Sequence, residues 1–365
     1  MVELKVSNDV VIYFSDNTPY IVDTRINEEY EIDNPKLLSD LFAYISGHQI
    51  EQSERQVLVD GGVLVPNERP ELLKNFGNDF LDIFHRGCTD VLNHIQVLSA
   101  VEYADLYLES CVREPGDVPP PRAKSISLKD TRTVNLPEFR HSVLEAVSLF
   151  DVLDRRKTVR EFFPHQATLE QLSDLLFCSF GYFHKHKNGE AEQYEPFKRR
   201  TSPSGGCLQS VEAYVCVFNV EGLDNGIYWY DAENHALKFV ENEISYDELS
   251  AMLVSQFFGN DCSFGVFLAA NLERFTWKYK TTRAYRVVSM EIGHFSQTAQ
   301  LVGTAMGLNT WITGAFNDAK IEQTLHLHDE RSIPLFFLAF GKGKYDRMHS
   351  LMKKRLERLK ANGQG

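Results

Sequence analysis

Residues 155–162 read RRKTVREF and place four cations and one hydroxyl within six positions. A guanidinium group binds two phosphate oxygens through parallel hydrogen bonds, a lysine adds a point charge, and a threonine hydroxyl adds a donor. The stretch follows a helix that the apolar spacing predicts over residues 142–153. It therefore predicts a phosphate cradle, although a solvated basic turn has the same composition.

A second stretch, residues 200–208, reads RTSPSGGCL and comes just before a predicted strand over residues 213–219. Paired glycines lack the Cβ atoms that keep a flat ring away from the backbone, so their N–H groups can bind the edge of a cofactor. A glycine pair is also common in ordinary loops. Alone, the stretch predicts no more than a turn.

A third stretch, residues 274–286, mixes aromatic side chains with cations. Such mixing also occurs in nucleic-acid-binding proteins, but the net charge of −13 and the pI near 5.4 argue against a nucleic-acid partner. Within the stretch, Lys278 stands beside Tyr279. Such a pair can transfer protons where burial lowers the pKa of the lysine or a nearby cation lowers that of the tyrosine.

A long helix is predicted over residues 287–306, because the apolar spacing is helical and no proline interrupts it. Its small residues are Gly293, Ala299, Gly303 and Ala305. They indicate a close approach by another element, either in the domain core or at a subunit interface.

The whole chain divides into a small and a large part. Residues 1–111 show strand, helix and strand patterns that predict a small winged-helix-like module with a helical extension. The proline-rich residues 112–140 indicate an extended linker. The mixture of helices and strands over residues 141–350 predicts an α+β catalytic domain.

Several classes of protein lack support in the sequence. There is no signal peptide and no run of about 18 apolar residues, which predicts a cytoplasmic protein with no membrane partner. The six cysteines lack C-x-x-C spacing, which favours buried free thiols and no metal site. The signatures of nicotinamide-binding folds, P-loop proteins and serine hydrolases are also missing.

Taken in order, the three stretches and the Glu-x-Gly-His sequence at 291–294 resemble the SagB-type dehydrogenases of the nitroreductase superfamily. The resemblance covers roughly residues 140–345. It implies a nitroreductase-like domain that binds flavin mononucleotide (FMN), preceded by the winged-helix-like domain. That domain is similar to the leader-peptide recognition elements of ribosomal peptide biosynthesis, which would bind an extended peptide by strand addition.

The resemblance also assigns the cofactor-binding residues. The FMN phosphate and ring edge would be held by Arg156, Lys157, Thr158 and Arg160, with Lys342 as a later phosphate contact. The isoalloxazine ring would be lined by Pro203, Ser204, Gly205, Gly206 and Leu208, and it would lie against Gly314 and Ala315. The family often has an aromatic residue or histidine and then proline after Leu208, where this chain has Gln209 and Ser210. The substrate is therefore left open.

Lys278 and Tyr279 match the Lys-Tyr pair of the azoline oxidases, which convert thiazolines and oxazolines to thiazoles and oxazoles. The resemblance implies that the flavin takes a hydride from one ring carbon while Lys278 or Tyr279 removes a proton from the other, and that oxygen reoxidises the flavin. It further implies a modified precursor peptide as substrate, a partner cyclodehydratase, and a homodimer with FMN at the subunit interface.

Two alternatives differ in chemistry. One is an FMN-dependent nitro- or ene-reductase of the same fold that is supplied by NAD(P)H. The other is a flavin-free scaffold subunit whose N-terminal module delivers a peptide to an enzyme complex.

Overall fold

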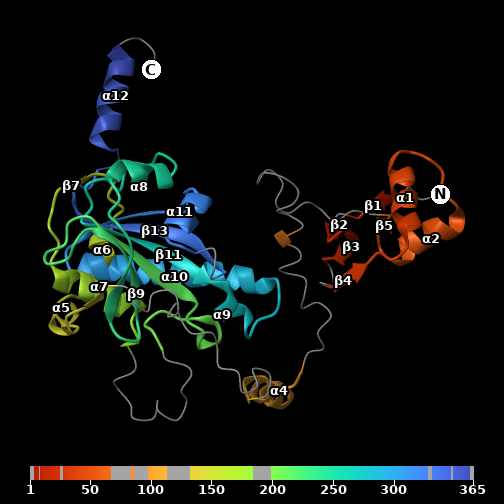
Figure 1. Ribbon diagram of the computed structural model, residues 1–365, viewed down its shortest axis with the longest axis horizontal. Helices are drawn as coiled ribbons and strands as arrows, with labels where there is room; N and C mark the ends of the chain where they lie inside the picture. The colour runs from red at the N-terminus through yellow and green to blue at the C-terminus, as the bar shows by residue number, and fades with distance from the viewer. Residues whose placement is uncertain are drawn as a thin grey trace. The chain divides into compact units, whose positions relative to one another are not determined.

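The structure, a computed structural model, describes residues 4–7, 9–24, 28–66, 84–85, 98–112, 132–183, 199–327, 331–346 and 348–361. The chain forms two compact units (Figure 1). One comprises residues 1–108 with 281–286, and the other comprises residues 109–280 with 287–365.

The N-terminal unit contains a three-stranded antiparallel sheet in the order β2-β3-β4. Its strands are β2 (Val10–Ser15), β3 (Thr18–Asp23) and β4 (Glu28–Glu31), and a separate pair joins β1 (Lys5–Val6) to β5 (Leu64–Val65). Asp16 and Asn17 both have positive φ, as the commonest two-residue hairpin turn requires, so β2 and β3 form a hairpin.

The helices of this unit are α1 (Pro35–Ile45) and α2 (Gln52–Asp60), and α4 (Ala100–Val112) has residues in both units. Asn34 caps α1 by accepting a hydrogen bond from Lys36 N at 3.1 Å. Leu41 and Leu58 bury the apolar faces of α1 and α2 in one small core. Much of the predicted helical extension lies outside the described residues.

The second unit is called the catalytic unit, after the catalytic domain that the sequence predicts there. Its described residues form an eight-stranded sheet with the path β12-β13-β11-β8-β9-β10-β6, and β7 pairs with β13. The strands are β6 (Thr133–Asn135), β7 (Phe162–Phe163), β8 (Val211–Val217), β9 (Gly226–Asp231), β10 (Ala236–Glu241), β11 (Phe264–Asn271), β12 (Asn309–Thr313) and β13 (Ser332–Gly343). Every residue of β8 and β11 is buried, which explains why these central strands are apolar almost throughout.

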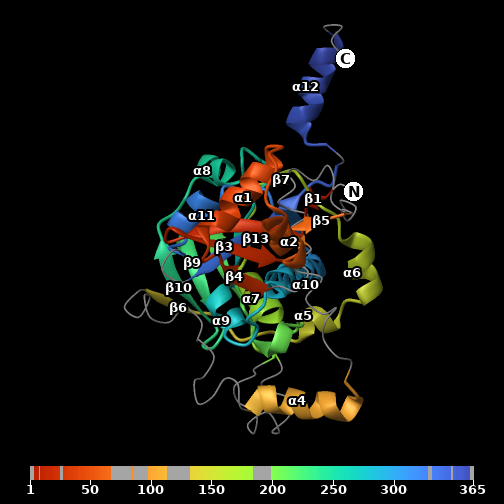
Figure 2. The same ribbon diagram turned by 90° about the vertical axis from the view of Figure 1, so that its right-hand side faces the viewer.

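Helices cover both faces of this sheet. The helices with residues in this unit are α5 (Ser142–Glu145), α6 (Leu149–Arg155), α7 (Leu169–Phe180), α8 (Tyr246–Met252), α9 (Leu272–Thr276), α10 (Arg283–Ala305, from residue 287 on), α11 (Asp318–Thr324) and α12 (Ser350–Ala361). Side chains of α7 and α10 share one hydrophobic core with the sheet, and those of α8 and α11 share the other. The α+β class is therefore as predicted. Helix α12 projects away from the sheet in both views (Figure 1, Figure 2).

The end of the predicted linker is part of the catalytic unit. Thr133–Asn135 form the edge strand β6 on β10, and Arg140 Nε and N donate to the buried carboxylate of Asp174 at 3.0 and 3.1 Å. A strand of three residues is too short to show an alternating pattern, so it carries no signal in the sequence. Residues 113–131 lie outside the described part of the chain.

The small residues of α10 lie on more than one face of the helix, and one of them allows the expected close approach of another element. Ala299 is fully buried, and a Cβ on Gly303 would lie 3.0 Å from the ring of Phe340 in β13. Gly293 has no atom within 4 Å of its Cβ position, and Met290 nearby is 49% exposed. Small residues of α10 therefore occur both on its buried face and on its exposed face.

In the part of the chain that the structure describes, none of the helices combines the length and apolar character needed to cross a membrane.

Candidate functional site

The loop that contains Pro203 to Leu208 has an unusual backbone. Gly205–Cys207 form one 3-10 turn, and φ is positive at Gly206 (57°), Cys207 (59°) and Gln209 (55°). A Cβ on Gly206 would lie 2.8 Å from Tyr279 Oη and 3.2 Å from Lys278 Cδ. The fold thus brings the predicted ring-binding loop into contact with the predicted catalytic pair.

Replacing Gly206 by alanine is expected to cost about 1–3 kcal/mol more than replacing Gly222, since only Gly206 meets a clash. Gly222 has φ of 71° and no atom within 4 Å of its Cβ position, so Gly222→Ala carries the same backbone cost alone. Urea unfolding of the two variants measures the difference. Equal losses would show that Tyr279 does not pack on the loop.

A buried carboxylate fastens the loop to α10. Glu291 is 1% exposed, and it accepts hydrogen bonds from Ser204 Oγ (3.0 Å), Ser210 N (3.1 Å) and Ser210 Oγ (3.2 Å). Arg274 of α9 donates to the carbonyl of Gln209 at 3.1 Å. Glu291 belongs to the Glu-x-Gly-His sequence, but neither it nor Arg274 was assigned a role from the sequence.

Burial raises the pKa of Glu291 above its ordinary value of 4.5, while hydrogen bonds from Ser204 and Ser210 oppose the shift. A raised pKa in the folded state means that this group's contribution to stability is full below pH 4.5 and is lost as pH rises through the raised pKa. The side-chain amide that Glu291→Gln introduces does not titrate. The Tm of that variant minus the Tm of the wild type should therefore increase from about pH 4 to pH 7. Thermal melts across this range test it, and a constant difference would contradict the shift.

The predicted catalytic pair, Lys278 and Tyr279, follows the short helix α9. Asn271 caps this helix by accepting from Arg274 N at 2.8 Å, and the Tyr279 amide donates to Phe275 O at 3.1 Å. Lys278 Nζ lies 5.8 Å from the centre of the Tyr279 ring, and both side chains are half-buried. A lysine side chain and a phenol are thus held side by side next to Gly206.

The predicted phosphate residues gather elsewhere in the catalytic unit. Thr158 bridges Thr310 of β12, and Phe163 pairs with Lys342 of β13, so the stretch 156–163 runs beside these two strands. Lys342 Nζ donates to the carbonyl of Gly307.

In the described part of the chain, the surroundings of these cations contain few negative charges. Among the described residues, no carboxylate forms an ion pair with Arg156, Lys157, Arg160 or Lys342. Lys157 lies 5.2 Å from the centre of the Tyr345 ring. The arrangement leaves several positive charges available to an anion.

The loop with Lys278 and Tyr279 lies near the start of β13, and the predicted phosphate residues lie near its end. Ser332 at its start pairs with Asn271, whose amide donates to Ser210 O beside the loop, whereas Lys342 near its end pairs with Phe163. Ten residues of extended strand span about 33 Å at ~3.3 Å per residue. Figure 1 shows α9 and β7 accordingly at opposite ends of the sheet. Gly314 and Ala315 form an exposed turn directly after β12.

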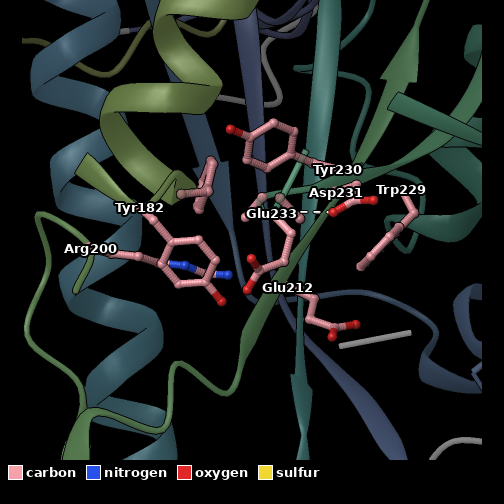
Figure 3. A pocket seen from close by; sticks show the side chains of 10 residues that line it. Tyr182, Arg200, Glu212, Trp229, Tyr230, Asp231 and Glu233 are labelled. Atoms are coloured by element: carbon pink, nitrogen blue, oxygen red, sulfur yellow. Dashed lines mark hydrogen bonds between the residues drawn. The ribbon is translucent and has the colours of Figure 1, made fainter. Parts of the chain in front are cut away.

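The first residue of the loop segment, Arg200, is a structural residue. It is 6% exposed, donates to Val211 O at 2.6 Å, and lies 5.2 Å from the centre of the Tyr182 ring, against which Figure 3 shows it. The small pocket drawn there is also lined by Glu212 and Trp229, and it contains none of the predicted FMN or catalytic residues. Arg200 therefore anchors the start of the loop and is not a candidate ligand of the flavin.

The nitroreductase family model matches residues 153–342. MJ1384 of Methanocaldococcus jannaschii, a protein whose name places it with the nitroreductases, is 33% identical over 213 residues, which cover 58% of this chain and 98% of that protein. A solved nitroreductase-type structure from Anabaena variabilis is 17% identical with a TM-score of 0.53, and the match covers 74% of this chain and 49% of that one.

The microcin B17-processing protein McbC of Escherichia coli is 30% identical over 156 residues. The match covers 39% of this chain and 54% of McbC, so this chain spans about half the length of that relative.

Proposed function

The chain belongs to the nitroreductase family, and from that premise we propose that it is an FMN-dependent dehydrogenase that oxidises a thiazoline or oxazoline in a peptide to the thiazole or oxazole. The observation that carries the proposal is the contact of Lys278 and Tyr279 with Gly206 in the loop. The likeness to McbC, a microcin-processing protein, supports a peptide as the substrate.

The residues present fit FMN. Cations that pair with no carboxylate among the described residues suit a phosphate, and the Cβ-free backbone at Gly206 suits a flat ring beside Tyr279. Bound FMN would supply a hydride acceptor. The part of the protein is then to hold the azoline against the loop and to take the proton from the neighbouring ring carbon with Lys278 or Tyr279.

We propose that each FMN site is built from two chains. The distance along β13 is too great for one flavin to contact both groups of residues in a single chain. The phosphate residues, with Gly314 and Ala315, would come from one chain, and the loop with Lys278 and Tyr279 from its partner. Pairing would also cover the exposed apolar residues of α6, which include Leu149 (66% exposed) and Phe150 (78%).

We assign the N-terminal unit to recognition of the precursor peptide. In its described three-stranded sheet, β2 and β4 are the edge strands, and a leader segment could extend the sheet by main-chain hydrogen bonds. A cyclodehydratase that forms the azoline would be the partner enzyme, in the cytoplasm, and oxygen the final electron acceptor.

A second candidate is an FMN-dependent nitro- or ene-reductase supplied by NAD(P)H. The observation that favours it is the match to MJ1384 over nearly its whole length, because that protein's name refers to nitroreductases.

One experiment separates the two candidates. The purified protein is incubated with FMN, air and a synthetic peptide that contains a thiazoline, and the peptide is analysed by mass spectrometry. Loss of two hydrogen atoms without NAD(P)H supports the dehydrogenase. An unchanged peptide, together with steady NAD(P)H oxidation in the presence of a nitroaromatic compound, supports the reductase.

A further inference from the structure

A closed ring of three hydrogen bonds holds the turn after β12. The Ala315 amide donates to Thr313 Oγ1 (3.0 Å), the Thr313 hydroxyl donates to Gln256 Oε1 (3.1 Å), and Gln256 Nε2 donates to the Ala315 carbonyl (3.0 Å). The ring uses both backbone groups of Ala315. It therefore fixes the peptide planes on both sides of this residue, including the one that carries the carbonyl of Gly314.

The chemistry of the ring requires an amide at position 256. The Ala315 carbonyl can only accept, so the side-chain nitrogen of Gln256 must face it. The Thr313 hydroxyl already accepts from the Ala315 amide and has its own hydrogen to give to Oε1. A glutamate would place a carboxylate oxygen against the carbonyl, and a methionine of similar size would make neither bond.

The loop before Gln256 is strained. Val254 has φ of 53° and Ser255 has φ of 63°, and a β-branched residue in this region is a true outlier. The loop is tied to its surroundings through Ser255 N to Ser250 O (2.8 Å) and Asn317 N to Met252 O (2.7 Å). Such strain persists where the surrounding structure enforces it, and it concentrates at functional sites. Here it places Gln256 beside the turn.

We propose that Gln256 is a positioning residue for the bound flavin, because it sets the peptide planes of the turn Gly314–Ala315. The inference rests on the proposed function, which puts this turn against the flavin. Gln256 itself need not touch the cofactor.

The test is FMN titration of the full-length apoprotein, together with the reduction potential and visible spectrum of the bound flavin. Gln256→Met and Thr313→Val each break the ring, and each is expected to raise the FMN Kd about tenfold. Both should also shift the reduction potential in the same direction. The double variant should be no worse than either single variant, because residues that act in one network are not additive.

Two controls make the result specific. Thr313→Ser keeps the hydroxyl and should retain the wild-type Kd and potential. Ser250→Ala removes a 3.0 Å hydrogen bond from the end of α8 to Asn260 Oδ1 without touching the turn, and it should leave both values unchanged.

The outcomes separate this inference from the proposed function. Wild-type protein that binds no FMN would overturn both. Wild-type protein that binds FMN, with unchanged Kd and potential in Gln256→Met and Thr313→Val, would overturn the role of Gln256 alone. Additive effects in the double variant would equally show that the two residues do not act as one ring.

Discussion

Replacing Lys278 by alanine or Tyr279 by phenylalanine is expected to slow azoline oxidation by about 10²- to 10⁴-fold, the usual contribution of a general base. FMN should remain bound, because the phosphate residues lie at the other end of β13. The measurement is the single-turnover rate of flavin reduction by a thiazoline peptide, followed by flavin absorbance.

Lys280→Ala is the matched control, since Lys280 is an exposed cation two positions from Lys278. It should keep the wild-type rate. If Lys278→Ala and Tyr279→Phe also keep the wild-type rate, the pair has no catalytic role. If both variants still support product formation in a complex with a separate enzyme, the scaffold alternative gains support.

Removing two guanidinium groups from the phosphate cradle is expected to abolish tight FMN binding. Each charge-assisted hydrogen bond contributes about 1.5–3 kcal/mol, so the double variant Arg156→Ala/Arg160→Ala should raise the FMN Kd at least about a hundredfold. Arg155→Ala is the control, because Arg155 is exposed in the same stretch and bonds back to Asp151 O at 3.2 Å. Equal Kd values for both variants and the wild type would place the phosphate elsewhere.

The same double variant tests whether each site is shared between chains. Co-expression with the Lys278→Ala chain gives mixed dimers in which one of two sites combines an intact cradle with an intact Lys278. Random pairing should therefore restore about a quarter of the wild-type activity, although each variant alone is inactive. A site contained within one chain would give no recovery.

The elements that could be predicted from the sequence are those with a regular apolar spacing within a single short stretch. The sequence predicts a helix over residues 169–180 and strands over 226–231 and 264–271, and α7, β9 and β11 have these bounds. Strand β13 was missed, because Pro334 within it argues against a central strand. The structure accommodates this proline at an irregularity in the pairing with β11, between Leu268 and Ala269, which no local pattern shows.

The candidate site was predicted in part for the same reason. Motif residues such as Lys278 and Gly206 could be singled out, and the structure brings these two together. The distance between these residues and the phosphate cradle is set by the length of β13. The motifs give no information about this strand. Glu291, Arg274 and Gln256 act through hydrogen bonds to residues far away in the sequence, and an isolated polar residue in a helix or loop gives no sequence signal for such bonds.

The most direct test of the central claim is the flavin content of the purified protein. Heat release of any bound flavin, its identification by chromatography, and its amount per chain are measured before and after reconstitution with excess FMN. We expect FMN at close to one molecule per chain, as two equivalent sites in a dimer require. No bound flavin even after reconstitution would contradict the cradle, the loop and the oxidoreductase function together.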